Sequence, residues 1–191
     1  MIMRFLSAAL AAFLLFAAQH SVAQAKSWTV VEDESRIGFS GTHAGAAFSG
    51  EFKKWTAEIA LDPEALDQAR AVVSVDLTSA ETGNATYDKS LPTADWFNTG
   101  ANATAVYRTE DIRKAENGNG YVAEGTLELR NVKVPVTLRF DLEINGDTAT
   151  MTGQSTIARL DFGIGKTSDV KGAWVSLDIP LDIKVVAKRT Q

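Results

Sequence analysis

The sequence predicts an all-β fold, an antiparallel barrel of about eight strands with short helical turns in the connections. Three observations predict it. Apolar and polar residues alternate with a period of two along most of the chain, which is typical of half-buried strands. Turn residues separate these runs, and no helical pattern is long enough for a βαβ unit. A β-sandwich fits the same pattern, but a barrel is favoured because closure removes the exposed edges of the long final strands.

The alternation is clearest over residues 125–140. One alternating run ends at Arg130 and a second begins at Val134, with residues 131–133 placed where a short hairpin connection belongs. Because Pro135 cannot donate a backbone hydrogen bond, we expect it near the start of the second strand or at an edge. The two runs therefore predict a pair of antiparallel strands.

Most of the remaining chain repeats this pattern. Between Phe52 and Trp55 the alternation shifts by one residue, which predicts a β-bulge that bends the sheet toward closure. Asn145-Gly146 is a strong turn dipeptide and separates two of the runs. Strands are expected at 28–31, 37–47, 48–61, 71–77, 105–112, 121–130, 134–144, 149–153, 157–162 and 175–185.

Two segments interrupt the strands. Asp62-Pro63 is a helix-start signal, with Asp as the N-cap and Pro at the first helical position. Residues 64–70 are therefore expected to form one or two helical turns. Residues 88–98 break the alternation and bring two aromatic residues together, so we expect a short helix or a covering loop there.

Residues 1–25 have the pattern of a secretory signal peptide. Arg4 precedes an apolar run over residues 5–18, and Ala23-Gln24-Ala25 offers a small-x-small cleavage site. The run is short for a membrane span, which disfavours an uncleaved anchor. We therefore expect an exported protein whose mature chain begins at Lys26 and forms one domain over residues 26–191.

The composition excludes several classes of site. The chain has no cysteine, and His43 is its one histidine after residue 25, so neither a histidine-cluster metal site nor a Cys–His pair can be built. No nucleophile-elbow sequence surrounds His43, which argues against a Ser-His-Asp triad. The 24 acidic and 19 basic residues give a net charge of −5, so nucleic acid and anionic membrane surfaces are poor partners. No metal or cofactor is expected.

Aromatic residues recur on the expected inner faces, next to glycine and alanine. For each aromatic residue singly, core packing is the simpler interpretation. A small barrel lined by alternating large and small side chains is either packed solid or leaves a slot for a ligand. The residue pattern leaves both interpretations open.

Five segments resemble, in order, the motifs of one protein family. They are SRIGF (35–39), THAGAAFSGEFKKW (42–55), LPTADWFNTGANATAVY (91–107), GTLELRNVKVPV (125–136) and ARLDFGIG (158–165). Together they resemble the YceI family of bacterial periplasmic proteins, over essentially the whole of residues 26–191. The resemblance implies a lipocalin-like, eight-stranded antiparallel barrel that binds a polyisoprenoid or similar amphiphilic chain in its apolar interior.

The resemblance also implies which residues bind the ligand. Carried over residue by residue, the candidate ligand-binding residues are Phe39, His43, Phe48, Phe52, Leu91, Trp96, Phe97, Tyr107 and Phe162. Arg159 belongs to the last motif, but we expect it to be structural and to pair with a carboxylate. Tyr87-Asp88 stands where the family often has Arg-Asp, and Asn131 stands where it usually has glycine.

The resemblance and the signal peptide together imply a periplasmic, non-enzymatic protein that sequesters, stores or carries an isoprenoid lipid of the polyprenyl or quinone type. Its partner would be that lipid or another long-chain amphiphilic lipid, with no nucleic acid and no membrane anchor after cleavage. The sequence leaves open whether the protein forms a homodimer. The alternative is a ligand-free interaction module in envelope stress or redox complexes. An enzyme ranks third, because the sequence does not visibly supply a catalytic group; a carboxylate buried in the barrel stays open as one.

Residues 91–97 are expected to cover one mouth of the barrel. Leu91, Trp96 and Phe97 are bulky and apolar, yet they lie with Pro92 in a stretch that breaks the alternation. Such side chains need an apolar surface to cover, and the mouth of an apolar barrel supplies one. A plug of the core would have the same sequence, so a lid and a plug remain alternatives.

Overall fold

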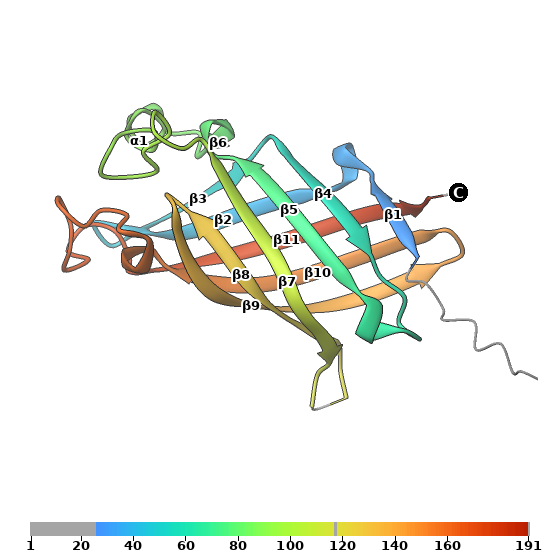
Figure 1. The fold of residues 1–191 in the computed structure, drawn as a ribbon. Helices are drawn as coiled ribbons and strands as arrows, with labels where there is room; N and C mark the ends of the chain where they lie inside the picture. Colours follow the sequence, from blue (N-terminus) through green and yellow to red (C-terminus); the bar gives the residue numbers. More distant parts are fainter. Residues whose placement is uncertain (1–25, 117, 191) are drawn as a thin grey trace, which may run out of the picture.

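The computed structural model describes residues 26–116 and 118–190, so the predicted signal peptide lies outside the described residues. One continuous sheet curls around an apolar interior (Figure 1). Its strands are β1 (Ser27–Val30), β2 (Arg36–His43), β3 (Ala46–Phe52), β4 (Trp55–Ala60), β5 (Arg70–Asp76), β6 (Ala80–Glu81), β7 (Thr104–Lys114), β8 (Tyr121–Leu129), β9 (Val132–Asn145), β10 (Thr148–Ala158) and β11 (Asp178–Arg189). The helical segments are α1 (Ala85–Ser90) and single 3₁₀ turns at Glu32–Glu34, Leu66–Gln68, Leu77–Ser79 and Arg159–Phe162.

The sheet closes on itself, which confirms the predicted antiparallel barrel. The strand order is β1-β4-β5-β7-β8-β9-β10-β11, and β1 pairs again with β11. β1 and β2 are consecutive pieces of one interrupted strand, since both pair with β11. β3 and β4 are likewise consecutive, and they pair with β2 and β1 respectively. β5 and β6, which flank the Leu77–Ser79 turn, pair with β4 and β3 respectively and form a third interrupted strand. With each interrupted strand counted once, the barrel has the expected eight strands, and its closure excludes a sandwich.

The irregularity between Phe52 and Trp55 is a two-residue break and not the predicted β-bulge. β3 pairs with β2 and β6, whereas β4 pairs with β1 and β5, so the chain changes partners at Lys53 and Lys54. The Leu77–Ser79 turn satisfies the two freed backbone amides: Lys53 N donates to the Ser79 carbonyl (3.1 Å) and Lys54 N to Ser79 Oγ (2.9 Å). A register shift does occur, but between Thr109 and Asp111 of β7.

Two turn predictions need correction. The hairpin between β8 and β9 is a tight two-residue turn at Arg130 and Asn131, both with left-handed backbones (φ 54° and 63°), and not a connection over residues 131–133. The helical turn after Asp62 begins only at Leu66, because Asp62 Oδ1 accepts from Glu64 N (3.2 Å) in a local turn.

The segment 157–162 is likewise only partly a strand. β10 ends at Ala158, and the chain then forms the 3₁₀ turn Arg159–Phe162, which ends at Gly163 in the left-handed region (φ 68°). Pro135 lies where expected, near the start of β9. There β9 pairs with β8 alone, since its pairing with β10 begins only at Arg139.

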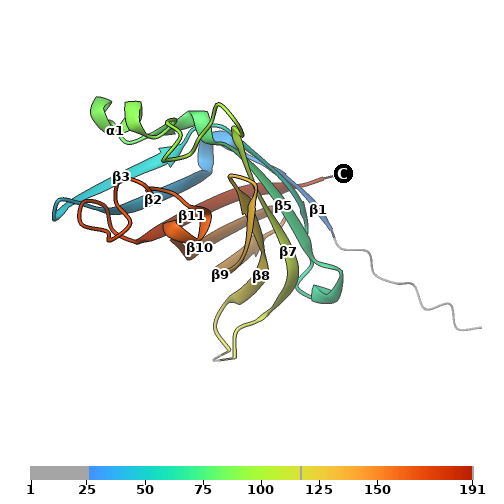
Figure 2. The ribbon, with the colours of Figure 1, turned by 60° about the vertical axis from the view of Figure 1, so that its left-hand side comes forward.

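Two apolar clusters fill the two halves of the barrel. The first surrounds Trp28 and Phe140, and the second surrounds Leu77 and Phe162. α1, the β2–β3 hairpin and the loop that precedes β11 gather at one end, as both views show (Figure 2). The β7–β8 hairpin projects from the other end. The first of these ends, which we call the loop end, is therefore where long connections cover the barrel.

Candidate functional site

The interior contains a cavity of about 270 Å³ between the strands. Its lining extends from Trp28 and Phe140 in one cluster to Trp96 and Ile164 at the loop end, so it runs along the barrel and not across it. The lining is almost wholly apolar. Its few hydroxyl or charged members are Tyr107, Thr109, Ser155 and Arg159. No Asp or Glu of the described residues lines it.

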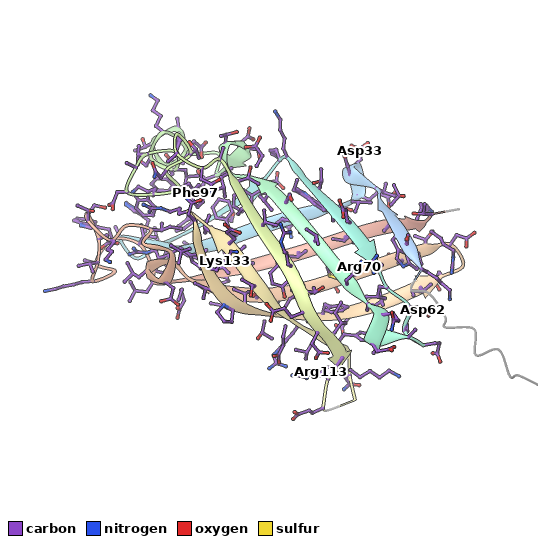
Figure 3. The ribbon with its side chains drawn as sticks, in the orientation of Figure 1. Asp33, Asp62, Arg70, Phe97, Arg113 and Lys133 are labelled. Carbon is purple, nitrogen blue, oxygen red and sulfur yellow. The ribbon has the colours of Figure 1, made fainter. Side chains whose placement is uncertain are left out.

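Seven of the nine candidate ligand-binding residues line this cavity. They are Phe39, Phe48, Phe52, Leu91, Trp96, Phe97 and Tyr107. Phe39 and Phe52 pack ring to ring (centroids 5.1 Å apart), and Phe52 continues to Phe97 (6.0 Å). Phe97 lies at the loop end of the barrel, opposite the end that bears Asp62 (Figure 3). The aromatic side chains thus form a connected wall from β2 to the 91–97 segment.

The other two candidates lie elsewhere. Phe162 is only 2% exposed and packs in the second apolar cluster, outside the cavity lining. His43 ends β2 at the rim, where its Nδ1 is 3.2 Å from the hydroxyl of Tyr87. Its ring also stacks near that of Trp174, with centroids 6.4 Å apart. His43 therefore lies at the rim, beyond the residues that line the cavity.

Tyr107 contributes its ring to the cavity while its hydroxyl contacts the wall. The hydroxyl lies 3.3 Å from the carbonyl oxygen of Ala123 and 3.2 Å from that of Val136. Burial raises the pKa of the Tyr107 phenol to about 12, so it stays neutral. Gly125 leaves room for the Tyr107 side chain, since a Cβ at residue 125 would be only 2.9 Å from the Tyr107 ring and hydroxyl.

The 91–97 segment is tied to its neighbours by backbone contacts. Arg130 Nη1 donates to the carbonyl oxygens of Trp96 (2.7 Å) and Gly163 (2.8 Å), and Arg130 Nη2 donates to that of Ala94 (2.9 Å). The side chain that follows β8 thus fixes the segment over the barrel while the Trp96 ring faces the cavity.

Asp95 makes a second attachment, to the loop before β11. Its carboxylate accepts from the amides of Thr167 and Ser168 (2.9 Å each) and from Ser168 Oγ (2.6 Å). The Ser168 hydroxyl and these amides lower the pKa of Asp95 to about 2. The ionised carboxylate of Asp95 therefore joins the 91–97 segment to the loop before β11.

Arg159 pairs with a carboxylate, as expected, and that carboxylate is Asp169. The two side chains are 1% and 4% exposed, and Nη2 of Arg159 is 2.9 Å from Oδ2 of Asp169. The remaining guanidinium donors contact backbone carbonyls, including those of Ile164 (2.8 Å) and Ser176 (3.0 Å). Burial would raise the pKa of Asp169, but the amides of Val175 and Trp174 and the charge of Arg159 lower it overall.

Arg159 nevertheless forms part of the cavity wall. Its guanidinium carbon is 5.9 Å from the centre of the Trp96 ring. Arg159 lies in a 3₁₀ turn and not in a strand, so a strand period does not give the direction of its side chain. Since each of its three guanidinium nitrogens donates to the protein, Arg159 holds the loop before β11 against the barrel.

Sequence reasoning missed Arg130, Asp95 and Asp169. Arg130 and Asp95 act between segments that are distant in the chain, such as Asp95 with Ser168, whereas Asp169 contacts nearby residues such as Arg159 and Val175. None of these contacts follows from a local sequence pattern. The missed cavity-lining positions did have a signal, since residues such as Ala57, Val73 and Leu138 occupy the apolar phase of their strands.

Within residues 26–116 and 118–190, no group of three or more His, Asp or Glu side chains is placed to hold a metal ion. No helix in the same ranges is long and apolar enough to cross a membrane.

Comparisons with known proteins agree with this architecture. The chain is similar to the UPF0312 protein of Serratia proteamaculans, with 30% identity over 162 residues that cover 81% of each chain. It is also similar to a UPF0312 protein of Vibrio cholerae, with 27% identity over 160 residues, or 80% of this chain and 82% of that one.

Two solved structures share the fold. BcnA of Burkholderia cenocepacia matches with a TM-score of 0.78 and 24% identity, over 83% of this chain and 99% of that one. A polyisoprenoid binding domain from Saccharophagus degradans matches with a TM-score of 0.63 and 16% identity, over 88% of this chain and all of that one. The model of the YceI-like domain matches residues 28–187, nearly the whole described barrel, and the chain therefore belongs to the YceI-like domain family.

Proposed function

We propose that this protein is a periplasmic, non-enzymatic carrier or store that holds an isoprenoid lipid of the polyprenyl or quinone type inside its barrel. The observation that supports the proposal best is the long cavity of about 270 Å³ with its almost wholly apolar wall. Burial in such a wall replaces burial in a membrane, so an apolar chain can be shielded from water. The solved domain from Saccharophagus degradans, described as polyisoprenoid binding, has the same fold and supports this ligand class.

The chemistry of the lining favours binding over catalysis. The polar groups that reach the cavity are largely occupied: the Tyr107 hydroxyl lies against backbone carbonyls, and Arg159 is bound to Asp169. The carboxylate that an enzyme would need in the barrel is not among the cavity-lining residues that the structure describes. An apolar tail requires none of these groups.

The expected affinity depends on chain length. At roughly 0.3 kcal/mol per heavy atom, a chain of about 20 carbons gains ~6 kcal/mol and one of about 40 carbons gains ~12 kcal/mol. The second figure corresponds to nanomolar binding. A carrier of this kind should therefore retain long isoprenoids through purification and lose short ones.

The test is to purify the protein from the periplasm, extract it with organic solvent and identify the extracted lipid by mass spectrometry. We expect a polyprenyl or quinone-type lipid at close to one molecule per barrel. Extraction of only phospholipid or fatty acid would contradict the isoprenoid class. An empty barrel that also fails to take up added polyprenol would instead support the ligand-free interaction module.

A further inference from the structure

The wall of the barrel is interrupted between β1 and β4, which lie side by side (Figure 1). The ladder between β2 and β3 ends where Ile37 pairs with Phe52, and the ladder between β1 and β4 begins where Trp28 pairs with Ile59. The structure describes both stretches of chain between these two pairs, and no ladder pair, side-chain hydrogen bond or ion pair joins one stretch to the other. We call this break the β1–β4 window.

A groove of about 480 Å³ lies in the window. Thr29 and Glu58 in its lining are exposed on the outer face of the barrel. Other residues of the groove also line the internal cavity: Trp28, Trp55, Ala57 and Ile59. Because successive side chains of a strand point to opposite faces of a sheet, a groove lined by both sets extends through the wall. The window therefore leads from the outer surface to the cavity, with Trp28 and Trp55 between the two.

The two tryptophans are held differently. Trp28 is 5% exposed, its Nε1 donates to the carbonyl oxygen of Leu61 (2.8 Å), and the guanidinium carbon of Arg189 lies 5.2 Å from its ring centre. Trp55 is half-buried, and its indole makes no hydrogen bond and no cation–π contact with the described residues. Trp55 can therefore turn aside without breaking such an interaction, whereas Trp28 cannot.

The loop end of the barrel is closed more firmly than the window. Arg130 binds the backbone of the 91–97 segment, and the Asp95 carboxylate binds the loop before β11. Opening the barrel at the loop end would break these charge-assisted hydrogen bonds, whereas the window has no ladder pair to break. We infer that the apolar chain of the ligand enters and leaves the barrel sideways, through the β1–β4 window, with Trp55 as the gate. This inference rests on the proposed function, because it concerns the route of the same ligand.

A cross-link can close the window, because the chain has no cysteine and introduced cysteines are the sole targets. Thr29 and Glu58 occupy the next position of the β1–β4 register, and both are exposed. Thr29→Cys with Glu58→Cys is therefore joined by a short bismaleimide. The matched control is Thr152→Cys with Lys184→Cys, an exposed pair that already lies in register in the β10–β11 ladder. Each variant before cross-linking is its own reference.

The probe is ubiquinone, a quinone with an isoprenoid tail, exchanged between the protein and phosphatidylcholine vesicles that are then removed by centrifugation. The cross-link across the window should slow both uptake and release about tenfold or more. The amount bound at equilibrium should not change, because a closed route raises the barrier to exchange and leaves the bound state as it was. The cross-linked control should exchange at the rate of its reference.

Trp55→Ala tests the gate. Removal of the ring should raise the rates of uptake and of release several-fold, because a gate controls passage in both directions. The comparison is Trp96→Ala, which removes a ring of the cavity wall outside the groove. It should raise the rate of release alone, because a lost contact destabilises only the bound state.

Equal exchange rates for the two cross-linked proteins would overturn the inference. Unchanged uptake by Trp55→Ala would do the same, and faster uptake by Trp96→Ala would place the route at the loop end. Wild-type protein that binds no ubiquinone and no polyprenol at equilibrium would overturn the proposed function, and the route with it. Bound lipid with equal rates overturns the route alone, so the two failures remain distinguishable.

Discussion

Arg159 is one of the most deeply buried side chains in the described part of the molecule, and its contacts explain why a charge is tolerated there. The guanidinium meets the Asp169 carboxylate and backbone carbonyls, so the desolvated charge is paired and its donors are used. A side chain so occupied joins the turn after β10 to the loop before β11. Its role is therefore to position that loop and not to bind a lipid headgroup.

Replacing Arg159 should accordingly cost stability before it affects binding. Arg159→Gln leaves Asp169 buried without its partner, and we expect a loss of about 3–5 kcal/mol in the free energy of unfolding by urea denaturation. Arg159→Lys keeps the charge but not the planar geometry and should lose less. If Arg159→Gln abolished lipid binding while the melting temperature stayed unchanged, the structural assignment would be wrong.

Asp95 gives the loop end a dependence on pH. Its folded-state pKa of about 2 lies below the ordinary value of 3.8, so its contribution to stability is present above about pH 4 and is lost as the pH falls toward 2. With allowance for solvent screening, that contribution is on the order of 1–2 kcal/mol. Thermal melts of wild type and Asp95→Asn between neutral pH and pH 2 measure it. The variant should melt lower at neutral pH and show a smaller loss on acidification; parallel curves would contradict this role.

Among the secondary-structure elements, the strands could be predicted from the sequence, but the breaks and turns between them could not. A period of two reports which side chains point inward, so the inward phase of β7, β8, β9 and β11 follows from local sequence. The break at Lys53 and Lys54 depends on a change of pairing partners, which an isolated strand cannot reveal. The same limit applies to Arg159, whose 3₁₀ turn continues an apparently alternating run.

The candidate ligand-binding residues show the same contrast between regular strands and the segments that interrupt them. Phe39, Phe48 and Phe52 line the cavity because they occupy the inward phase of regular strands. Phe162 lies in a helical turn, where a strand period does not determine the direction of a side chain, and His43 ends β2 beyond the residues that line the cavity. Motif resemblance identified the segments correctly, but it could not decide which of their residues face the interior.

The 91–97 segment can now be tested as a lid. Trp96 lines the cavity and is half-buried, while the backbone around it is fixed by Arg130. Trp96→Ala should therefore weaken lipid retention several-fold and change the stability of the ligand-free protein by less than about 2 kcal/mol. Retention is measured by mass spectrometry after dialysis and stability by urea denaturation.

The matched control for the lid is Phe162→Ala. Phe162 is buried outside the cavity lining, so its truncation should cost roughly 3–5 kcal/mol of stability with no separate effect on retention. A loss of that size in Trp96→Ala, with retention unchanged, would make the 91–97 segment a plug of the core.

For the molecule as a whole, export is a prediction from the sequence that the barrel and its cavity do not test. The prediction of export to the periplasm rests on Arg4, the apolar run over residues 5–18 and the Ala23-Gln24-Ala25 cleavage site. Mass-spectrometric sequencing of periplasmic protein should find Lys26 at the N-terminus. Protein that retains Met1 in the membrane fraction would point to an uncleaved anchor.

The proposal that the ligand occupies the barrel interior can be tested by filling that interior from one strand. Ala57 and Thr56 are neighbours on β4, but Ala57 lines the cavity and Thr56 is exposed on the outer face. Ala57→Trp and Thr56→Trp therefore add the same ring inside and outside the barrel. The decisive measurement is the amount of isoprenoid lipid extracted per molecule of folded protein. We expect Ala57→Trp to retain at most a small fraction of the wild-type amount and Thr56→Trp to retain all of it. Equal retention by the two variants would contradict an interior site.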